Sequence, residues 1–347
     1  MNGSAVKIYL SALTPLLLSA CSHPLPLVPS QKATISSEAA DFIERSSYRS
    51  LPDFVPIKPA QIVKGRDEFN RLEAPHEDAL IAKYGLRTEM TKIAGVPVMV
   101  IRPRQVRPGL EDAVALNIHG GGFMIGSARD RSALMVAGSL GITVYSIEYT
   151  MAPEAKYPVA INQSLAVYHA LIQRVGAGRM IGVSSSAGGQ IMLAMLMRAH
   201  RQGLPMMRAQ VLFTPAADVS GDGDSAQANN GRDVVALGPT LRTIREFYLG
   251  GADPRDPAVS PIYDNFPANF PASVMVSGTR DLLLSNAVRL SWKLKEASVP
   301  AELLVAEGGW HGFHWEYETP ESKATMRAVT AFLLGHLSAA MADTNVH

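Results

Sequence analysis

From residue 98 onward, short apolar runs alternate with amphipathic stretches, and this alternation constrains the fold more than any other feature of the chain. Seven runs have the length and composition of buried strands: 98–102, 113–118, 142–148, 180–183, 209–213, 274–277 and 301–305. Helical periodicity lies between them, at 131–140, 158–175, 187–201, 286–297 and 323–336. Alternation of this kind predicts an α/β fold, with a mostly parallel central sheet flanked by helices.

The composition favours one large core and excludes a polyanion-binding protein. Apolar residues make up 47% of the 347 residues, which is ample for a buried interior. The 32 Lys and Arg residues nearly balance the 31 Asp and Glu residues and are interspersed with them. We therefore expect no nucleic-acid partner.

The first 21 residues have the pattern of an export signal. Lys7 provides the positive region, residues 8–18 are apolar, and no acidic residue precedes Glu38. The stretch ends in Leu-Ser-Ala-Cys, which resembles the lipobox of bacterial lipoproteins, and Cys21 is the only cysteine. We expect an exported protein that a lipid on Cys21 attaches to the membrane. The alternatives are an ordinary secretory signal, giving a periplasmic or secreted protein, or an incidental thiol after a mispredicted start.

The remaining chain divides by composition. Residues 22–36 contain three prolines and are expected to form an extended tether. Residues 37–95 are amphipathic and are expected to form short helices in the N-terminal part of a cap. Residues 96–347 are the expected main domain, with a cap insertion near 219–250 that consists of a Gly-, Asp- and Asn-rich loop and a short helix at 240–248.

Ser186 lies where an expected strand meets an expected helix, in Ser184-Ser185-Ser186-Ala187-Gly188-Gly189. A sharp strand-to-helix turn lifts a hydroxyl out of the sheet and sets it at a helix N-terminus, as a nucleophile requires. The usual pattern is G-x-S-x-G, and Ser184 occupies the first glycine position. Ser184 and Ser185 are rival nucleophiles, and a simple helix cap is the non-functional alternative.

A second glycine-rich segment, His119-Gly120-Gly121-Gly122-Phe123, follows the strand expected at 113–118. Glycines allow backbone N–H groups to point inward together, which is how an oxyanion hole is built. We expect its donors to be Gly121, Gly122 and Ala187. The position of His119 beside the glycines favours a role in stabilising the loop.

Asp281 and His311 each follow an expected strand, and 30 residues separate them. That gap fits one helix and one strand, so both side chains should emerge at the sheet edge where Ser186 lies. Such convergence is what a catalytic triad needs, with His311 as base and Asp281 as the acid that orients it. His314 is a nearby histidine without the flanking glycines.

These motifs together resemble the hormone-sensitive-lipase-like branch of the α/β-hydrolases, a family that includes bacterial esterases and lipases. The residues that carry the resemblance are 119–123, the Tyr-x-x-Ala-Pro-Glu segment at 149–154, residues 186–189, Asp281 and His311. The pattern departs from the family at Ser184 and Ser185. The resemblance covers roughly residues 98–340 and implies an α/β-hydrolase fold with a helical cap.

The resemblance implies a serine carboxylic-ester hydrolase that acts through an acyl-enzyme on short or medium acyl esters. Two alternatives stay open: a lactone or acetyl hydrolase with the same triad, and a noncatalytic binding protein of this fold. The chain has neither a Cys/His cluster with metal spacing nor a phosphate or dinucleotide fingerprint. We expect a small-molecule ester as substrate, no cofactor and no metal; the oligomeric state is not predicted.

Overall fold

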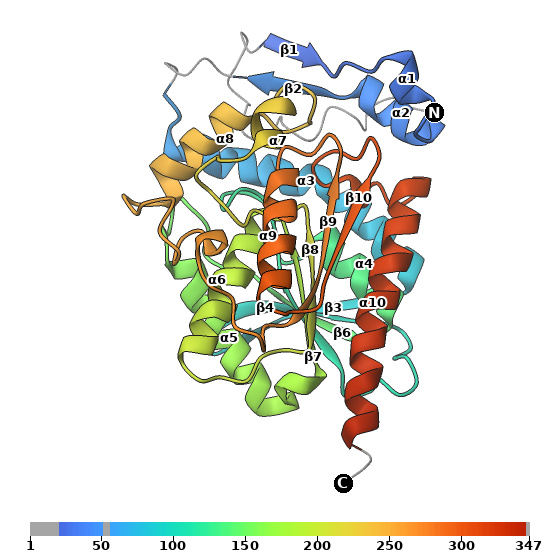
Figure 1. The fold of residues 1–347 in the computed structure, drawn as a ribbon, viewed down its shortest axis with the longest axis vertical. Helices are drawn as coiled ribbons and strands as arrows, with labels where there is room; N and C mark the ends of the chain where they lie inside the picture. Colours follow the sequence, from blue (N-terminus) through green and yellow to red (C-terminus); the bar gives the residue numbers. More distant parts are fainter. Residues whose placement is uncertain (1–20, 51–55, 345–347) are drawn as a thin grey trace.

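The computed structural model describes residues 21–50 and 56–344 and shows an eight-stranded sheet between two layers of helices (Figure 1). The strands are β3 (Arg87–Ile93), β4 (Val96–Arg102), β5 (Val114–Ile118), β6 (Thr143–Ile147), β7 (Met180–Ser185), β8 (Ala209–Phe213), β9 (Ala272–Gly278) and β10 (Ala301–Ala306). Their order across the sheet is β10-β9-β8-β7-β5-β6-β4-β3. All pairs from β10 to β6 are parallel, whereas β4 is antiparallel to both β6 and β3. The predicted α/β architecture with a mostly parallel sheet is confirmed.

Each of the seven predicted strands is present, and β3 is an addition. β3 is an exposed edge strand with mixed polar residues, so it has no apolar run to reveal it. Ala94 and Gly95 join it to β4, and both have positive φ, at 49° and 80°. Two such residues form the tight turn that suits the twist of a hairpin. Part of the segment expected to belong to the cap therefore extends the central sheet.

Helices cover both faces of the sheet and bury its apolar side chains. One face packs against α5 (Val159–Val175), α6 (Ala187–Arg201) and α9 (Leu284–Glu296). The other packs against α4 (Arg131–Leu140) and α10 (Pro320–Thr344). The parallel strands are buried on both faces, as crossover helices require.

The N-terminal region is attached to this body, in contrast to the tether expected at 22–36. It forms β1 (Cys21–Pro24), α1 (Pro29–Lys32), α2 (Ser37–Arg45) and β2 (Ser47–Ser50), with β1 antiparallel to β2. Leu25 is buried in the core, and the Pro26 carbonyl accepts a hydrogen bond from the Arg280 guanidinium at 2.8 Å. The prolines rule out a long helix here, but they leave the segment free to pack in an extended form.

Residues 59–84 form one 26-residue helix, α3 (Pro59–Tyr84), where short helices were expected. Gly85 ends it with φ 60°, and the Leu86 N–H bonds the Ile81 carbonyl. One stripe of α3 faces the body: Ile62, Gly65, Phe69, Glu73, Glu77 and Leu80. Two glutamates in the stripe conceal its periodicity in the sequence. They are buried because Glu73 pairs with Arg131 at 2.8 Å and Glu77 pairs with Arg129 at 3.4 Å.

The segment expected near 219–250 contains α7 (Asp224–Ala228) and α8 (Leu237–Thr243), which continues as a π-helical turn over Ile244–Tyr248. In Figure 1, α7 and α8 lie at the same end of the molecule as α3 and the β1–β2 pair. Within the part of the chain that the structure describes, no helix is both long and apolar enough to span a membrane. The predicted signal residues 1–20 lie outside the described residues.

Candidate active site

Ser186 sits on a strained turn between β7 and α6. Its φ of 48° and ψ of −122° are unusual for a residue with a side chain, and strain of this kind concentrates at functional sites. The turn depends on a close approach to the neighbouring loop, because a Cβ on Gly188 would lie 2.1 Å from the Ile118 carbonyl oxygen. Gly188 therefore allows α6 to begin directly beside β5.

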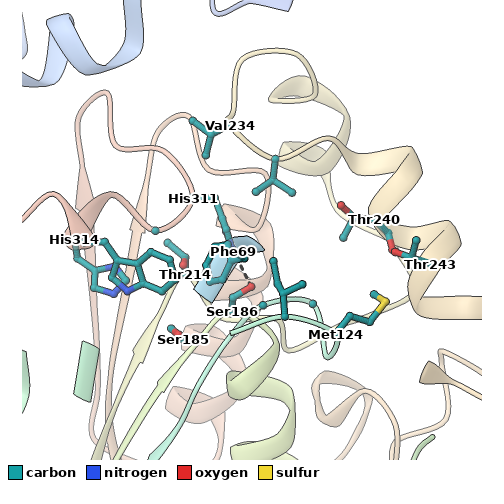
Figure 2. Close-up of a pocket in the computed structure, with 16 residues that line it drawn as sticks. Phe69, Met124, Ser185, Ser186, Thr214, Val234, Thr240, Thr243, His311 and His314 are labelled. Carbon is teal, nitrogen blue, oxygen red and sulfur yellow. Dashed lines mark hydrogen bonds between the residues drawn. The ribbon is translucent and has the colours of Figure 1, made fainter. Parts of the chain in front are cut away.

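The three predicted triad residues meet. The Ser186 Oγ and His311 Nε2 atoms are 2.9 Å apart, and His311 Nδ1 lies 3.0 Å from Asp281 Oδ1 (Figure 2 shows the serine–histidine contact). Asp281 is fully buried and also accepts from the Leu283 N–H and the Ser277 hydroxyl. These bonds fix the carboxylate, which in turn fixes the imidazole.

The rival residues are placed elsewhere. Ser184 and Ser185 belong to β7 and are buried, with no hydrogen-bond partner for either hydroxyl within the described ranges. His119 Nδ1 bonds the Gly120 carbonyl at 2.8 Å, and its ring stacks on Tyr149. His314 Nε2 contacts the Ser132 hydroxyl. Neither of these histidines bonds Ser186.

The backbone conformation of the loop expected to supply the oxyanion hole leaves two of its N–H groups without a protein acceptor among the described residues. Gly121 and Gly122 have φ of 101° and 59°, and neither N–H donates to a protein group within residues 21–50 and 56–344. The Gly121 carbonyl accepts from the Met124 and Ile125 N–H groups, which folds the loop back on itself. Ala187 is the first residue of α6, so its N–H has no partner within the helix. All three N–H groups are thus available at positions beside Ser186.

Arg66, on α3, supports this loop and has no motif that marks it in the sequence. Its guanidinium donates to the Met124 carbonyl at 2.8 Å and the Ala152 carbonyl at 2.7 Å, and it makes a two-pronged ion pair with Glu154. The planar guanidinium suits this set of acceptors. Arg66 therefore joins α3 to the glycine loop and to the Tyr-x-x-Ala-Pro-Glu segment.

Asp233 is a second buried carboxyl beside the triad, which the sequence analysis missed. It accepts from the backbone N–H groups of His311 at 2.9 Å, Leu282 at 2.8 Å and Val234. Burial and the neighbouring charge of Asp281 raise the pKa of Asp233 to about 7. No expected strand directly precedes Asp233, and Gly231 before it is one of several glycines in a polar loop, so only its spatial neighbours reveal it.

The pKa of His311 lies above its ordinary value. Burial acts to lower this pKa, but the hydrogen bond that His311 donates to Asp281 and the charges of Asp281 and Asp233 outweigh burial. The imidazolium form is therefore stabilised by two carboxyl groups. This favours a histidine that accepts a proton during a reaction.

One potential metal-ligating atom from each of Asp233, Asp281 and His311 lies within 4.8 Å of the other two, which is compact enough for a metal site. Their hydrogen bonds account for this closeness. Both Asp233 oxygens accept backbone N–H groups, and both Asp281 oxygens accept protein donors. The cluster fits a hydrogen-bonded triad with a supporting carboxyl.

A cavity of about 130 Å³ opens on Ser186 and His311. Its walls are mainly apolar and include Phe69 from α3 and Val234 from the insertion. Figure 2 shows Met124, Thr240 and Thr243 at its border. A second hollow of about 60 Å³ lies against Ser186 and Ala187. Both predicted cap segments thus contribute to the space around the nucleophile.

Cys21, the predicted lipid attachment residue, is the first described residue and begins β1. Its backbone pairs with that of Ser50 in the β1–β2 ladder. The structure therefore places the end of the predicted signal at the end of the molecule where α3 and α8 lie (Figure 1).

Comparison with known proteins gives consistent matches. A family model described as alpha/beta hydrolase fold matches residues 115–315. A putative acetyl-hydrolase, LipR, from Mycobacterium tuberculosis is 30% identical over 260 residues, which cover 74% of this chain and 83% of the relative.

Solved structures agree with this. The crystal structure of the esterase E25 has a TM-score of 0.81 and 29% identity, covering 90% of this chain and 97% of its own. A crystal structure described as an esterase from the bacterial hormone-sensitive lipase family has a TM-score of 0.72 and 27% identity, covering 90% and 100%. The predicted family resemblance is confirmed.

Proposed function

We propose that this protein is a serine carboxylic-ester hydrolase that acts through an acyl-enzyme. The chain belongs to the α/β-hydrolase family, in its hormone-sensitive-lipase-like branch. The observation that carries the proposal is the 2.9 Å contact between Ser186 Oγ and His311 Nε2, at a cavity that can admit a small ester. The relatives are hydrolases, which disfavours a noncatalytic binding protein.

In the first half of the reaction, His311 Nε2 takes the Ser186 proton as Oγ attacks the ester carbonyl carbon. The carbonyl π electrons move to oxygen, and the oxyanion is held by the N–H groups of Gly121, Gly122 and Ala187. When the tetrahedral intermediate collapses, the bond to the alcohol oxygen breaks and the protonated His311 gives its proton to that oxygen. Asp281 stabilises the transient imidazolium through the 3.0 Å bond to Nδ1.

In the second half, a water molecule replaces the alcohol. His311 takes a proton from this water as its oxygen attacks the acyl carbon. The second intermediate releases the acid, and Ser186 recovers its proton from His311. One ester and one water thus give one acid and one alcohol.

Esters with short acyl groups are the favoured substrates. A cavity of about 130 Å³ has little room for a long chain, and the side chains of α3 and α8 border it. Acetyl esters are a specific second candidate, because LipR is named an acetyl-hydrolase. A lactone remains compatible with the same triad, since its ring ester needs no other group.

The test is a panel of p-nitrophenyl esters from acetate to decanoate, with several lactones, assayed on the wild type and on Ser186→Ala. We expect activity to be highest on short esters and to fall about 10⁶-fold in Ser186→Ala while the fold is kept. Full activity of a folded Ser186→Ala would contradict the proposal. Preference for lactones over every open ester would favour the alternative.

We also propose that the protein is exported and anchored through a lipid on Cys21. The support is the charged and apolar pattern before Leu-Ser-Ala-Cys. Cys21→Ser should move the protein from the membrane fraction to the soluble exported fraction. If Cys21→Ser stays in the membrane fraction as the wild type does, lipid attachment is contradicted. If the wild type and Cys21→Ser are both found in the soluble exported fraction, an ordinary secretory signal is favoured.

A further inference from the structure

Three residues in the lining of the cavity beside Ser186 have buried polar atoms that no described protein group satisfies. They are Ser185 Oγ, Thr214 Oγ1 and His314 Nδ1, and none has a hydrogen-bond partner in the described part of the chain. All three residues line the cavity, and their exposed fractions are 2%, 1% and 0%. Figure 2 shows them on the side of Ser186 opposite Met124. Buried polar atoms without partners are uncommon and call for an explanation.

Thr214 is held in a conformation that its side chain disfavours. It follows β8 with φ of 43°, although β-branched residues rarely adopt positive φ. Its backbone N–H bonds the Val276 carbonyl at 2.7 Å, and the preceding Phe213 carbonyl accepts the Ser186 N–H at 2.9 Å. The strain therefore lies directly beside the nucleophile turn, where it fixes the Thr214 hydroxyl in the cavity wall.

The contacts of His314 show which of its ring nitrogens has no partner in the part of the chain that the structure describes. Burial lowers the pKa of His314 well below its ordinary value, so the ring is neutral. The Ser132 hydroxyl oxygen accepts the Trp315 Nε1 hydrogen at 2.9 Å, and it lies 2.9 Å from His314 Nε2 but 3.4 Å from Asp130 Oδ1. The Ser132 hydroxyl thus has three polar neighbours, and its one hydrogen goes either to Asp130 Oδ1 or to His314 Nε2. Because Nε2 is engaged with Ser132, Nδ1 is the ring nitrogen left to bond another group, as donor in one tautomer and as acceptor in the other.

We propose that Ser185, Thr214 and His314 form a polar subsite that binds an acceptor oxygen, such as a ketone, ether or hydroxyl oxygen, carried by the ester substrate away from its scissile carbonyl. The inference rests on the proposed esterase function and adds the substrate class. The Ser185 and Thr214 hydroxyls can each donate to such an oxygen, and His314 Nδ1 adds a third polar atom to the same part of the lining. A hydrocarbon group in the same place leaves all three atoms without a hydrogen bond. Buried polar atoms without hydrogen bonds have a free-energy cost, so binding of the hydrocarbon group is weaker.

The apolar walls and the polar subsite together define the substrate. Phe69, Ile125 and Val234 suit a short carbon chain, and the polar subsite suits an oxygen on that chain. Since two hollows flank Ser186, the oxygen belongs either to the acyl group or to the alcohol group. The experiment has one arm for each source.

The acyl arm compares the p-nitrophenyl esters of 4-oxopentanoate and 4-methylpentanoate, which differ by a ketone oxygen in place of a methyl group. The alcohol arm compares 4-oxopentyl acetate with 4-methylpentyl acetate. The ratio of kcat/KM within each pair is measured for the wild type, Thr214→Val and Ser185→Ala. Ser184→Ala is the matched control, because its hydroxyl is also buried and unpaired but does not line the cavity.

In one arm, we expect the wild type to prefer the ketone ester and each subsite variant to lose about tenfold of that preference. Ser184→Ala should keep the wild-type ratio. Equal ratios for the wild type and both subsite variants in both arms would overturn the subsite. If Thr214→Val fails to fold, Ser185→Ala gives the same decision. A wild type that hydrolyses no ester, or a Ser186→Ala that hydrolyses all of them, would instead overturn the esterase function.

Discussion

The Asp233 carboxylate accepts the backbone N–H of His311 at 2.9 Å, so a residue of the cap insertion directly holds the loop that carries the catalytic histidine. The same carboxylate accepts the Leu282 N–H, next to Asp281. One side chain thus ties the acid loop to the base loop. The alignment of the triad depends on this third segment as well as on the ends of the strands.

Asp233→Asn should lower kcat about 10-fold to 100-fold with little change in KM. The amide keeps one acceptor oxygen but turns an N–H group toward the Leu282 N–H, so the two loops separate slightly. Small misplacements of reacting groups have costs of this size. Steady-state kinetics measures the effect, with Asp224→Asn, an exposed acid of the same insertion, as control. A fall in Asp224→Asn equal to that in Asp233→Asn would refute the positioning role.

The pH profile of kcat/KM should rise through the pKa of His311, which must be neutral to take the Ser186 proton. Because the carboxyl groups raise this pKa, the half-maximal point should lie above pH 6.5. Asp233→Asn removes one of the negative charges, so its half-maximal point should move to lower pH. A profile that is flat from pH 5 to pH 8 would show that His311 is not the base.

Arg66→Lys should weaken the attachment of α3 to the glycine loop. Lysine retains a charge but lacks the planar fork that reaches Glu154 and two carbonyls together. We expect a loss of about 1–3 kcal/mol in the free energy of unfolding, together with lower kcat/KM. Urea denaturation and ester kinetics measure the two effects. Arg71→Lys, on the exposed side of the same helix, should change neither.

Gly188→Ala should destabilise the protein by about 3 kcal/mol or more and abolish activity. The added Cβ would lie 2.1 Å from the Ile118 oxygen and 2.6 Å from the His119 oxygen, and neither backbone group can move without shifting β5. Gly335→Ala is the contrasting case. Gly335 lies exposed in α10 with open space around it, so alanine there should stabilise the helix by about 0.5–1 kcal/mol. Equal unfolding midpoints for the two variants would refute the packing argument.

The sequence predicted the residues whose position depends on the strands. Ser186, Asp281 and His311 each follow an apolar run, and parallel strands deliver their ends to one edge of a sheet. The glycine loop could be predicted for the same reason. The α/β pattern therefore predicts that these groups meet at one edge of the sheet.

Residues that act through distant partners gave no such signal. Arg66 is one of many charged residues on an amphipathic helix, and only the folded chain shows that Met124, Ala152 and Glu154 surround it. Asp233 resembles the other acids of a polar loop. The length of α3 was underestimated because two of its buried positions are glutamates, whose arginine partners lie far away in the sequence.

Ser186 is tested as the nucleophile most directly by mass spectrometry of the protein after reaction with a fluorophosphonate, followed by peptide mapping. We expect one covalent adduct on Ser186, its loss in Ser186→Ala, and its slow formation in His311→Ala. An adduct on Ser184 or Ser185 in the wild type, or unchanged labelling of Ser186→Ala, would contradict the assignment of Ser186 as the nucleophile.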